Sequence, residues 1–88
     1  MNKFIIEDNF LVLKKSINMS KKDQNGNCRE YGSISLYCPS TDEFQRILIY
    51  ENYKEILSKY ETNRVFKIKL QVNIVTKDGK SATYIKIL

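Results

Sequence analysis

Between residues 65 and 74 apolar and polar side chains alternate almost without interruption, and this period of two constrains the fold more than any other feature of the chain. The even-numbered positions are apolar: Phe66, Ile68, Leu70, Val72 and Ile74. The odd-numbered positions are mostly polar: Val65, Lys67, Lys69, Gln71 and Asn73. Successive side chains of a strand point to opposite faces, so the pattern predicts a strand with one face in a core. The chain is therefore expected to build a sheet with one buried face.

Four further segments fit the same sheet. They are residues 10–19, 31–38, 44–50 and 83–88. In the first of them, Ile17 and Met19 are expected to continue the core parity of Leu11 and Leu13. A polar loop over residues 20–27 follows this strand, residues 39–42 form a tight connection, and the Asp78-Gly79 pair predicts a hairpin turn before the last strand.

The period changes between the third and fourth predicted strands. Four apolar residues there stand at i, i+3, i+4 and i+7, which lays one stripe along a helix: Tyr53, Ile56, Leu57 and Tyr60. We expect this helix over residues 52–63, with Asn52 as its N-cap paired with Glu55, and with Asn63 as its stop signal.

Three strands, one helix and two strands is the order of the OB-fold, a five-stranded Greek-key barrel. The expected fold class is therefore all-β with one helix. With 88 residues the chain is long enough for one core, so we expect a single domain over residues 1–88, in which residues 1–9 form an N-terminal extension.

The second and third predicted strands direct aromatic side chains to the face opposite the core. In the second strand Tyr31, Ser33, Ser35 and Tyr37 share this parity, and Gly32, Ile34, Leu36 and Cys38 share the core parity. In the third strand Ile47 and Ile49 belong to the core, which directs Phe44, Arg46, Leu48 and Tyr50 outward. Single-stranded nucleic acid binds to such a surface because bases stack on aromatic rings and phosphates attract cations.

The charge of the chain agrees with an acidic partner. Its formal net charge is +5 at pH 7, from 15 Lys and Arg against 10 Asp and Glu, and the two signs are interspersed. Lysines occur in the predicted first loop, on the polar side of the fourth strand and at the hairpin. The predicted nucleic-acid-binding set is Tyr31, Tyr37, Phe44, Arg46, Tyr50, Lys21, Lys22, Lys67, Lys69 and Lys80.

Several classes of function are not expected. The chain has no histidine and two cysteines, Cys28 and Cys38, so a zinc site within one chain is not predicted. No Ser or Cys has a recognisable activating partner, and we expect neither an enzyme nor a cofactor. The two cysteines flank an extended strand, about 33 Å apart, and are expected to stay unpaired. No long apolar run predicts a membrane span or a signal peptide, so a cytoplasmic protein is expected.

Over residues 10–88 the chain resembles the small OB-fold single-stranded-DNA-binding proteins of bacteria and their mobile elements. The strand order, the helix, the polar first loop and the residues at Tyr31, Tyr37, Phe44, Arg46 and Tyr50 carry this likeness, although tryptophan, a frequent base-stacking residue in that family, is absent. The resemblance implies sequence-tolerant binding of single-stranded DNA by an auxiliary replication or mobile-element protein, such as one encoded by a plasmid. A helicase or another replication protein is an implied partner, and a homo-oligomer is compatible with it.

Each candidate residue also has a purely structural interpretation. Tyr31 and Tyr37 are strand formers that cover a sheet whether or not they bind a ligand. Phe44 would then plug the end of the barrel, and Arg46 would pair with Glu30 or Glu43. Lysines on a polar strand face are often only solvated. A protein-binding adaptor or a phage- or element-encoded inhibitor would use the same aromatic surface, and an RNA ligand also remains open.

Overall fold

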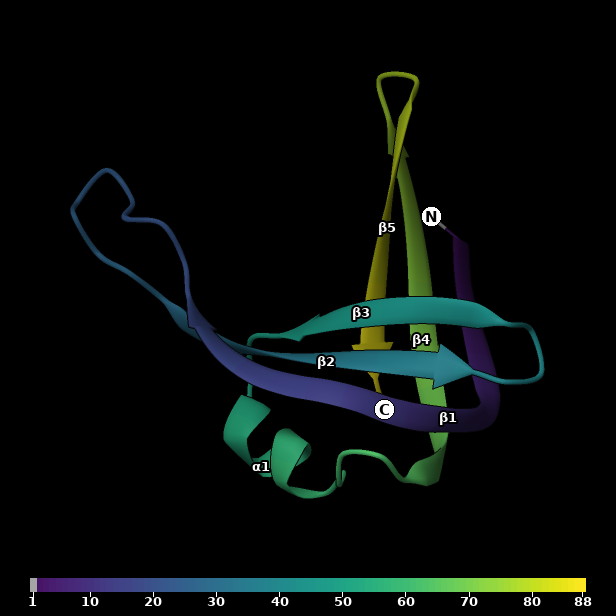
Figure 1. Cartoon of the computed structure of the whole chain (residues 1–88). Coiled ribbons are helices and arrows are strands. Elements are labelled where there is room, and N and C mark those ends of the chain that lie inside the picture. Colours follow the sequence, from purple (N-terminus) through teal and green to yellow (C-terminus); the bar gives the residue numbers. More distant parts are fainter. Residues whose placement is uncertain (1) are drawn as a thin grey trace.

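The computed structural model describes residues 2–88, and strands dominate it (Figure 1). The elements follow the chain as β1 (Asn2–Met19), β2 (Glu30–Cys38), β3 (Glu43–Ile49), α1 (Tyr53–Ser58), β4 (Val65–Lys77) and β5 (Lys80–Ile87). The predicted order of three strands, one helix and two strands is confirmed. The single helix within residues 2–88 is too short to cross a membrane.

All five strands form one antiparallel sheet in the order β3-β2-β1-β4-β5. Residues 2–11 of β1 pair with β4, and residues 11–19 pair with β2. Because β1 changes partner at Leu11, the sheet curls into a half-barrel, in which β2 and β3 cross in front of β4 and β5 (Figure 1). Within residues 2–88 no backbone hydrogen bond joins the edge strands β3 and β5, so the barrel is only partly closed.

A β-bulge in β1 changes the parity that the sequence predicted for this strand. The pairing with β2 shifts between Val12 and Lys14, which inserts Leu13 as an extra residue. The buried side chains before the bulge are Phe10 and Val12, so the prediction that Leu11 and Leu13 face the core was wrong. The strand also begins at Asn2 instead of residue 10.

Beyond the bulge, β1 and β2 form a ribbon that extends away from the core (Figure 1). Ile17 and Met19 lie on this ribbon and are 54% and 59% exposed, so the prediction that they continue the core was wrong as well. The ribbon ends in the connection over residues 20–29, where the Asp23 carboxylate accepts hydrogen bonds from the backbone N–H groups of Asn25 and Asn27. Both errors have the same cause. The bulge in β1 and the extension of the ribbon away from the core depend on contacts between strands, which the alternation within one strand does not reveal.

The core lies on the concave side of the sheet, and the predicted core parity of β2, β3 and β4 is confirmed. Its members are Phe10, Val12, Ile34, Leu36, Cys38, Ile47, Ile49, Leu57, Ile68, Leu70 and Ile87. Helix α1 covers one end of this core with Leu57, and Tyr53, Ile56 and Tyr60 pack against it, which confirms the predicted stripe. The Asp78-Gly79 pair also forms the predicted two-residue hairpin, since both residues have positive φ, 53° and 75°.

Helix α1 is shorter than the predicted span over residues 52–63. Asn52 adopts a left-handed conformation with φ 54°, and its side chain makes no capping hydrogen bond, so the predicted capping pair with Glu55 was wrong. The backbone carbonyl of Asn52 accepts a hydrogen bond from the Ile56 N–H instead. After the helix, the Asn63 N–H donates to the Val12 carbonyl at 2.7 Å, and the Val12 N–H donates to the Arg64 carbonyl at 3.0 Å. These long-range bonds hold the segment after α1 against β1 in a non-helical form.

Gly32 of β2 permits the close approach of α1. A Cβ atom at this position would lie 2.9 Å from both Leu57 Cδ1 and Tyr53 Cβ, which is closer than side chains tolerate. Two polar contacts fix the helix in place. Lys15 Nζ donates to the Leu57 carbonyl at 3.0 Å, and the Tyr53 hydroxyl donates to the Glu30 carboxylate, which raises the pKa of Tyr53. The helix therefore locks the position of β2 relative to β1.

Candidate nucleic-acid interface

The convex side of β2 and β3 carries two pairs of aromatic rings, formed across the two strands. Tyr37 lies opposite Phe44, with ring centroids 4.8 Å apart and a tilt of 42°. At the other end Tyr31 packs against Tyr50, which follows β3, with centroids 5.4 Å apart and a tilt of 38°. We call this surface the outer face, and it consists of Tyr31, Ser33, Ser35, Tyr37, Phe44, Arg46, Leu48 and Tyr50.

The two aromatic pairs stand at opposite ends of the outer face. Tyr31 and Tyr37 are six residues apart on one strand, which corresponds to about 20 Å at roughly 3.3 Å per residue. Phe44 is 69% exposed and Tyr50 is 46% exposed, whereas their tyrosine partners are half-buried. Phe44 therefore does not plug the barrel end. Each pair presents an accessible ring surface to the solvent.

Between the aromatic pairs the outer face is polar and carries one cation. Arg46 lies opposite Ser35, and its side chain is exposed. Within residues 2–88 no carboxylate lies within ion-pair distance of Arg46. Glu30, one of the two partners considered from the sequence, instead accepts the Tyr53 hydroxyl and lies 3.9 Å from Lys54 Nζ. The guanidinium of Arg46 is thus available to an external anion.

A hydrogen-bonded cluster from β1 and β2 supports this polar centre. The hydroxyls of Ser16 and Ser33 are 2.6 Å apart, and Asn18 Nδ2 donates to them at 3.2 and 3.3 Å respectively. Ser33 is only 3% exposed, so its hydroxyl is satisfied within the protein. The cluster links β1 to β2 beneath the exposed residues of the outer face.

The ring of Tyr37 is held by the turn that joins β2 to β3. Its hydroxyl donates to Asp42 Oδ1 at 2.7 Å, and Asp42 lies in that turn with a positive φ of 55°. This hydrogen bond to the carboxylate raises the pKa of Tyr37 above its ordinary value, because deprotonation would place two negative charges together. The hydrogen bond ties the Tyr37 ring to the turn between β2 and β3.

Two cations near the outer face were not in the predicted set. Arg29 Cζ lies 5.0 Å from the ring centroid of Tyr50, in a cation–π contact. Extending the alternation of Tyr31 and Ser33 two residues toward the N-terminus would have found Arg29, because it has the same parity. Lys14 lies opposite Ser35 on β1. Lys14 belongs to a group of lysines near the first loop, but its place beside Ser35 depends on the bulge at Leu13, which strand alternation does not predict.

The predicted lysines separate into three locations. Lys21 and Lys22 are exposed on the connection over residues 20–29, which continues from the end of β2 that carries Tyr31 (Figure 1). Lys67 and Lys69 lie on β4, separated from β2 by β1, and their Nζ atoms are 3.3 and 3.6 Å from the Glu7 carboxylate. Lys80 stands at the tip of the β4–β5 hairpin, beyond the curled part of the sheet. The aromatic residues and Arg46 come together as predicted, whereas these lysines do not join them.

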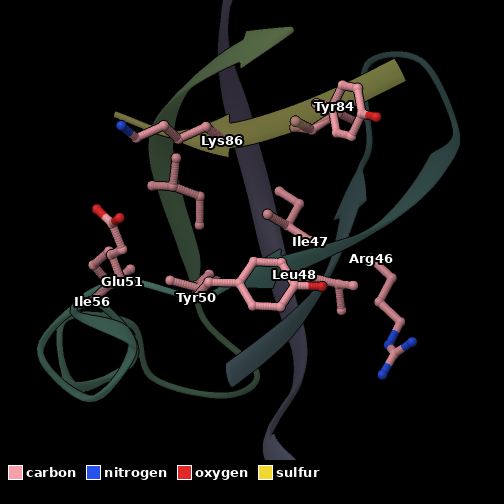
Figure 2. A pocket seen from close by; sticks show the side chains of 11 residues that line it. Arg46, Ile47, Leu48, Tyr50, Glu51, Ile56, Tyr84 and Lys86 are labelled. Atoms are coloured by element: carbon pink, nitrogen blue, oxygen red, sulfur yellow. The ribbon is translucent and has the colours of Figure 1, made fainter. Parts of the chain in front are cut away.

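A groove of about 580 Å³ runs beside the outer face, along the open seam between β3 and β5 (Figure 2). Arg46, Leu48 and Tyr50 line its β3 side, and Tyr84 and Lys86 line its β5 side. Five isoleucines from β3, α1 and β5 complete its apolar lining: Ile47, Ile49, Ile56, Ile85 and Ile87. The outer face therefore continues around the free edge of β3 into an apolar groove.

The cysteines lie apart from this surface. Cys38 is buried, with its Sγ atom 3.3 Å from the Ser40 hydroxyl, and Cys28 is exposed on the connection between β1 and β2. Neither forms a disulfide. Within residues 2–88 no three His, Cys, Asp or Glu side chains gather in a way that would hold a metal ion.

Comparison of the chain with protein-family models, with curated proteins and with solved structures gave no match.

Proposed function

We propose that the protein binds single-stranded nucleic acid, with DNA as the favoured ligand, across the outer face of β2 and β3. The observation that carries this proposal is the arrangement of the two aromatic pairs, Tyr31 with Tyr50 and Tyr37 with Phe44, on either side of the unpaired Arg46. Bases of any sequence have a π-face, so stacking on these rings requires no base-specific hydrogen bonds. Binding is accordingly sequence-tolerant.

In this mechanism the rings and the cations have separate roles. Each base that stacks on an aromatic pair contributes roughly 1 to 3 kcal/mol. The strand between the two stacked bases passes over the polar centre, where Arg46 and Lys14 meet its phosphates. Arg29, which contacts the ring of Tyr50 in the free protein, provides a further cation for phosphates at that end, with or without loss of its contact with the ring. The hydrogen bonds of Ser33 and Tyr37 keep the surface in one conformation, which reduces the entropy lost on binding.

The topology supports the assignment of this half-barrel to the OB-fold. Its β1 is shared by β2 and β4, and its helix lies between β3 and β4, as in that fold. OB-folds bind oligonucleotides on the β2–β3 surface, and the loops after β1 and β4 flank the ligand. Here the loop after β1 carries Lys21 and Lys22, whereas Lys80 begins β5 at the far end of the hairpin. Lys67 and Lys69 contribute less, because the Glu7 carboxylate already neutralises part of their charge.

The process that we propose is auxiliary replication or maintenance of a mobile element such as a bacterial plasmid, in the cytoplasm and beside a helicase or another replication protein. No residue on the outer face singles out the 2′-hydroxyl, so RNA is the alternative ligand of the same surface.

A protein-binding function is the second candidate, and the apolar groove favours it. Tyr50 and Arg46 belong to residue types that are enriched at protein interfaces, and both line the groove together with five isoleucines. An adaptor or an inhibitor of another protein would insert apolar side chains there and would have no need of phosphate contacts.

A fluorescence-polarisation titration separates these functions. Labelled oligo-dT and oligo-rU of equal length are titrated with the protein at two salt concentrations. We expect saturable binding of oligo-dT that weakens as salt rises, because phosphate contacts release counterions. Tighter binding of oligo-rU would instead assign RNA as the ligand. Absence of saturable binding to either oligonucleotide at both salt concentrations would contradict the proposal and would favour the protein-binding function.

A further inference from the structure

The first half of β1 is an edge strand that exposes three consecutive apolar side chains. Residues 2–11 pair with β4 on one side, whereas pairing with β2 begins only at Leu11. On the free edge, Phe4, Ile5 and Ile6 are 48%, 63% and 47% exposed. Side chains of both parities are therefore accessible, together with the unpaired backbone groups of the strand.

An edge of this kind is a template for another strand. Phe4 and Ile6 share one face with their β4 partners Val72 and Leu70, so they continue the apolar concave side of the sheet beyond the core. Ile5 points to the other face. We infer that this edge pairs antiparallel with the same edge of a second copy of the chain, in a two-fold symmetric dimer.

Symmetry restricts the possible registers of such a pair. The two-fold axis of an antiparallel pair stands perpendicular to the sheet, so each residue keeps its face in both copies. Directly opposite residues also share a face. The residue numbers of two directly opposite residues must therefore add up to an even number. In such a register, the residue whose number is half of this sum lies opposite its own copy. Registers that use the apolar stretch are centred on Phe4, Ile5 or Ile6.

Side-chain chemistry selects the register centred on Ile5. In this register Phe4 lies opposite Ile6 of the second copy, so apolar residues meet each other. Lys3 lies opposite Glu7 of the second copy, where it would add to the exposed ion pairs that Glu7 makes with Lys67 and Lys69. Centring on Ile6 would place Phe4 opposite Asp8, whose carboxylate already accepts a 2.5 Å hydrogen bond from Ser40. Centring on Phe4 would leave Lys3 opposite Ile5. Only the Ile5 register pairs every residue from Lys3 to Glu7 with a complementary one.

The resulting sheet is continuous through both copies, in the order β5-β4-β1-β1-β4-β5. Such an interface is isologous, because each copy uses the same surface, and it removes the exposed apolar edge from both copies at once. It also joins the two apolar concave faces that Phe4 and Ile6 extend. The inference does not depend on the proposed function, because the outer face of β2 and β3 takes no part in the interface.

Sedimentation equilibrium of the full chain over a dilution series tests this inference. We expect the parent protein to have twice the monomer mass at high concentration and to dissociate on dilution. Ile5→Lys places two like charges opposite each other at the axis and should give the monomer mass throughout. Ile17→Lys is the matched control, since Ile17 is a similarly exposed isoleucine of the same strand but lies far along the ribbon with β2. A monomeric parent, or a dimer that persists in Ile5→Lys, would overturn the inference.

Disulfide trapping tests the register itself. In a Cys28→Ser background, Ile5→Cys places two thiols directly opposite each other, with Cα atoms about 4.5 to 5.5 Å apart, which is within disulfide range. We expect this variant to form a covalent dimer under mild oxidation. Lys3→Cys alone should not, whereas a mixture of the Lys3→Cys and Glu7→Cys variants should form a covalent heterodimer. Efficient self-linking of Lys3→Cys without linking of Ile5→Cys would show that the Ile5 register is incorrect.

Discussion

Removal of one aromatic ring from the outer face separates stacking from electrostatics. Tyr37→Ala deletes the ring that packs 4.8 Å from Phe44, together with the hydroxyl that donates to Asp42. A base that stacks on this pair loses roughly 1 to 3 kcal/mol. At 25 °C this loss corresponds to a rise of about 5- to 150-fold in the Kd for oligo-dT. The slope of log affinity against log salt should stay nearly unchanged, because a ring releases no counterion.

Two control variants isolate the ring as the cause. Tyr37→Phe keeps the ring and removes only the hydroxyl, so its affinity should remain close to that of the parent. Tyr84→Ala removes another exposed tyrosine, which lies on β5 outside the outer face and is 60% exposed. We expect its oligo-dT affinity to be unchanged. Thermal melting confirms for each variant that the fold is retained.

The separation of the two aromatic pairs predicts which losses of binding free energy add up. Tyr31 and Tyr37 are about 20 Å apart along β2, and mutational effects at sites farther apart than about 10 Å generally add. The free-energy losses of Tyr31→Ala and Tyr37→Ala should therefore sum in the double variant, for an oligonucleotide long enough to reach both pairs. Tyr37→Ala and Phe44→Ala should not sum, because the two rings are in contact. If both single tyrosine variants fold normally and bind oligo-dT as tightly as the parent, the rings only cover the sheet and the stacking mechanism is refuted.

Three other changes test neighbouring parts of the structure. Arg46→Ala should weaken oligo-dT binding and flatten the salt slope by about 0.7, the value for one phosphate on a single strand; an unchanged slope would place Arg46 outside the phosphate path. Gly32→Ala should destabilise the fold by about 1 to 3 kcal/mol, because the new methyl group meets Leu57 and Tyr53 at 2.9 Å, and a melting temperature equal to that of a Ser35→Ala control would show that α1 does not pack on β2 there. The hydrogen bond from Ser40 lowers the pKa of Asp8, so the stability from this contact is present above the ordinary pKa of an aspartate and is lost as the pH falls through the lowered value. Ser40→Ala should raise the pKa of Asp8 toward its ordinary value in an NMR titration, and an unchanged pKa would exclude Ser40 as the cause.

The local part of the fold was determined by the sequence. Strand parity is a property of the extended backbone, so the alternation in β2, β3 and β4 was enough to divide core from surface, with Ile34, Ile47 and Ile68 buried as predicted. The Asp78-Gly79 turn and the apolar stripe of α1 were predictable for the same reason, because both depend on residues that are close in sequence. Parity also predicted that Tyr31 and Tyr37 share one face of β2 and that Phe44 and Arg46 share one face of β3, whereas the pairing of the two strands was needed to join them into one surface.

Only the tertiary structure decided how these elements meet. The bulge at Leu13 reversed the parity of β1, and the hydrogen bonds of Val12 with Asn63 and Arg64 kept the chain after α1 from continuing the helix. Strand register then paired Tyr37 with Phe44 and brought Tyr31 to Tyr50, while the strand order placed Lys67 and Lys69 beside Glu7 and away from the outer face. Each of these features is a contact between residues distant in sequence. Such contacts form only when the whole sheet curls around its core, and no local pattern specifies them.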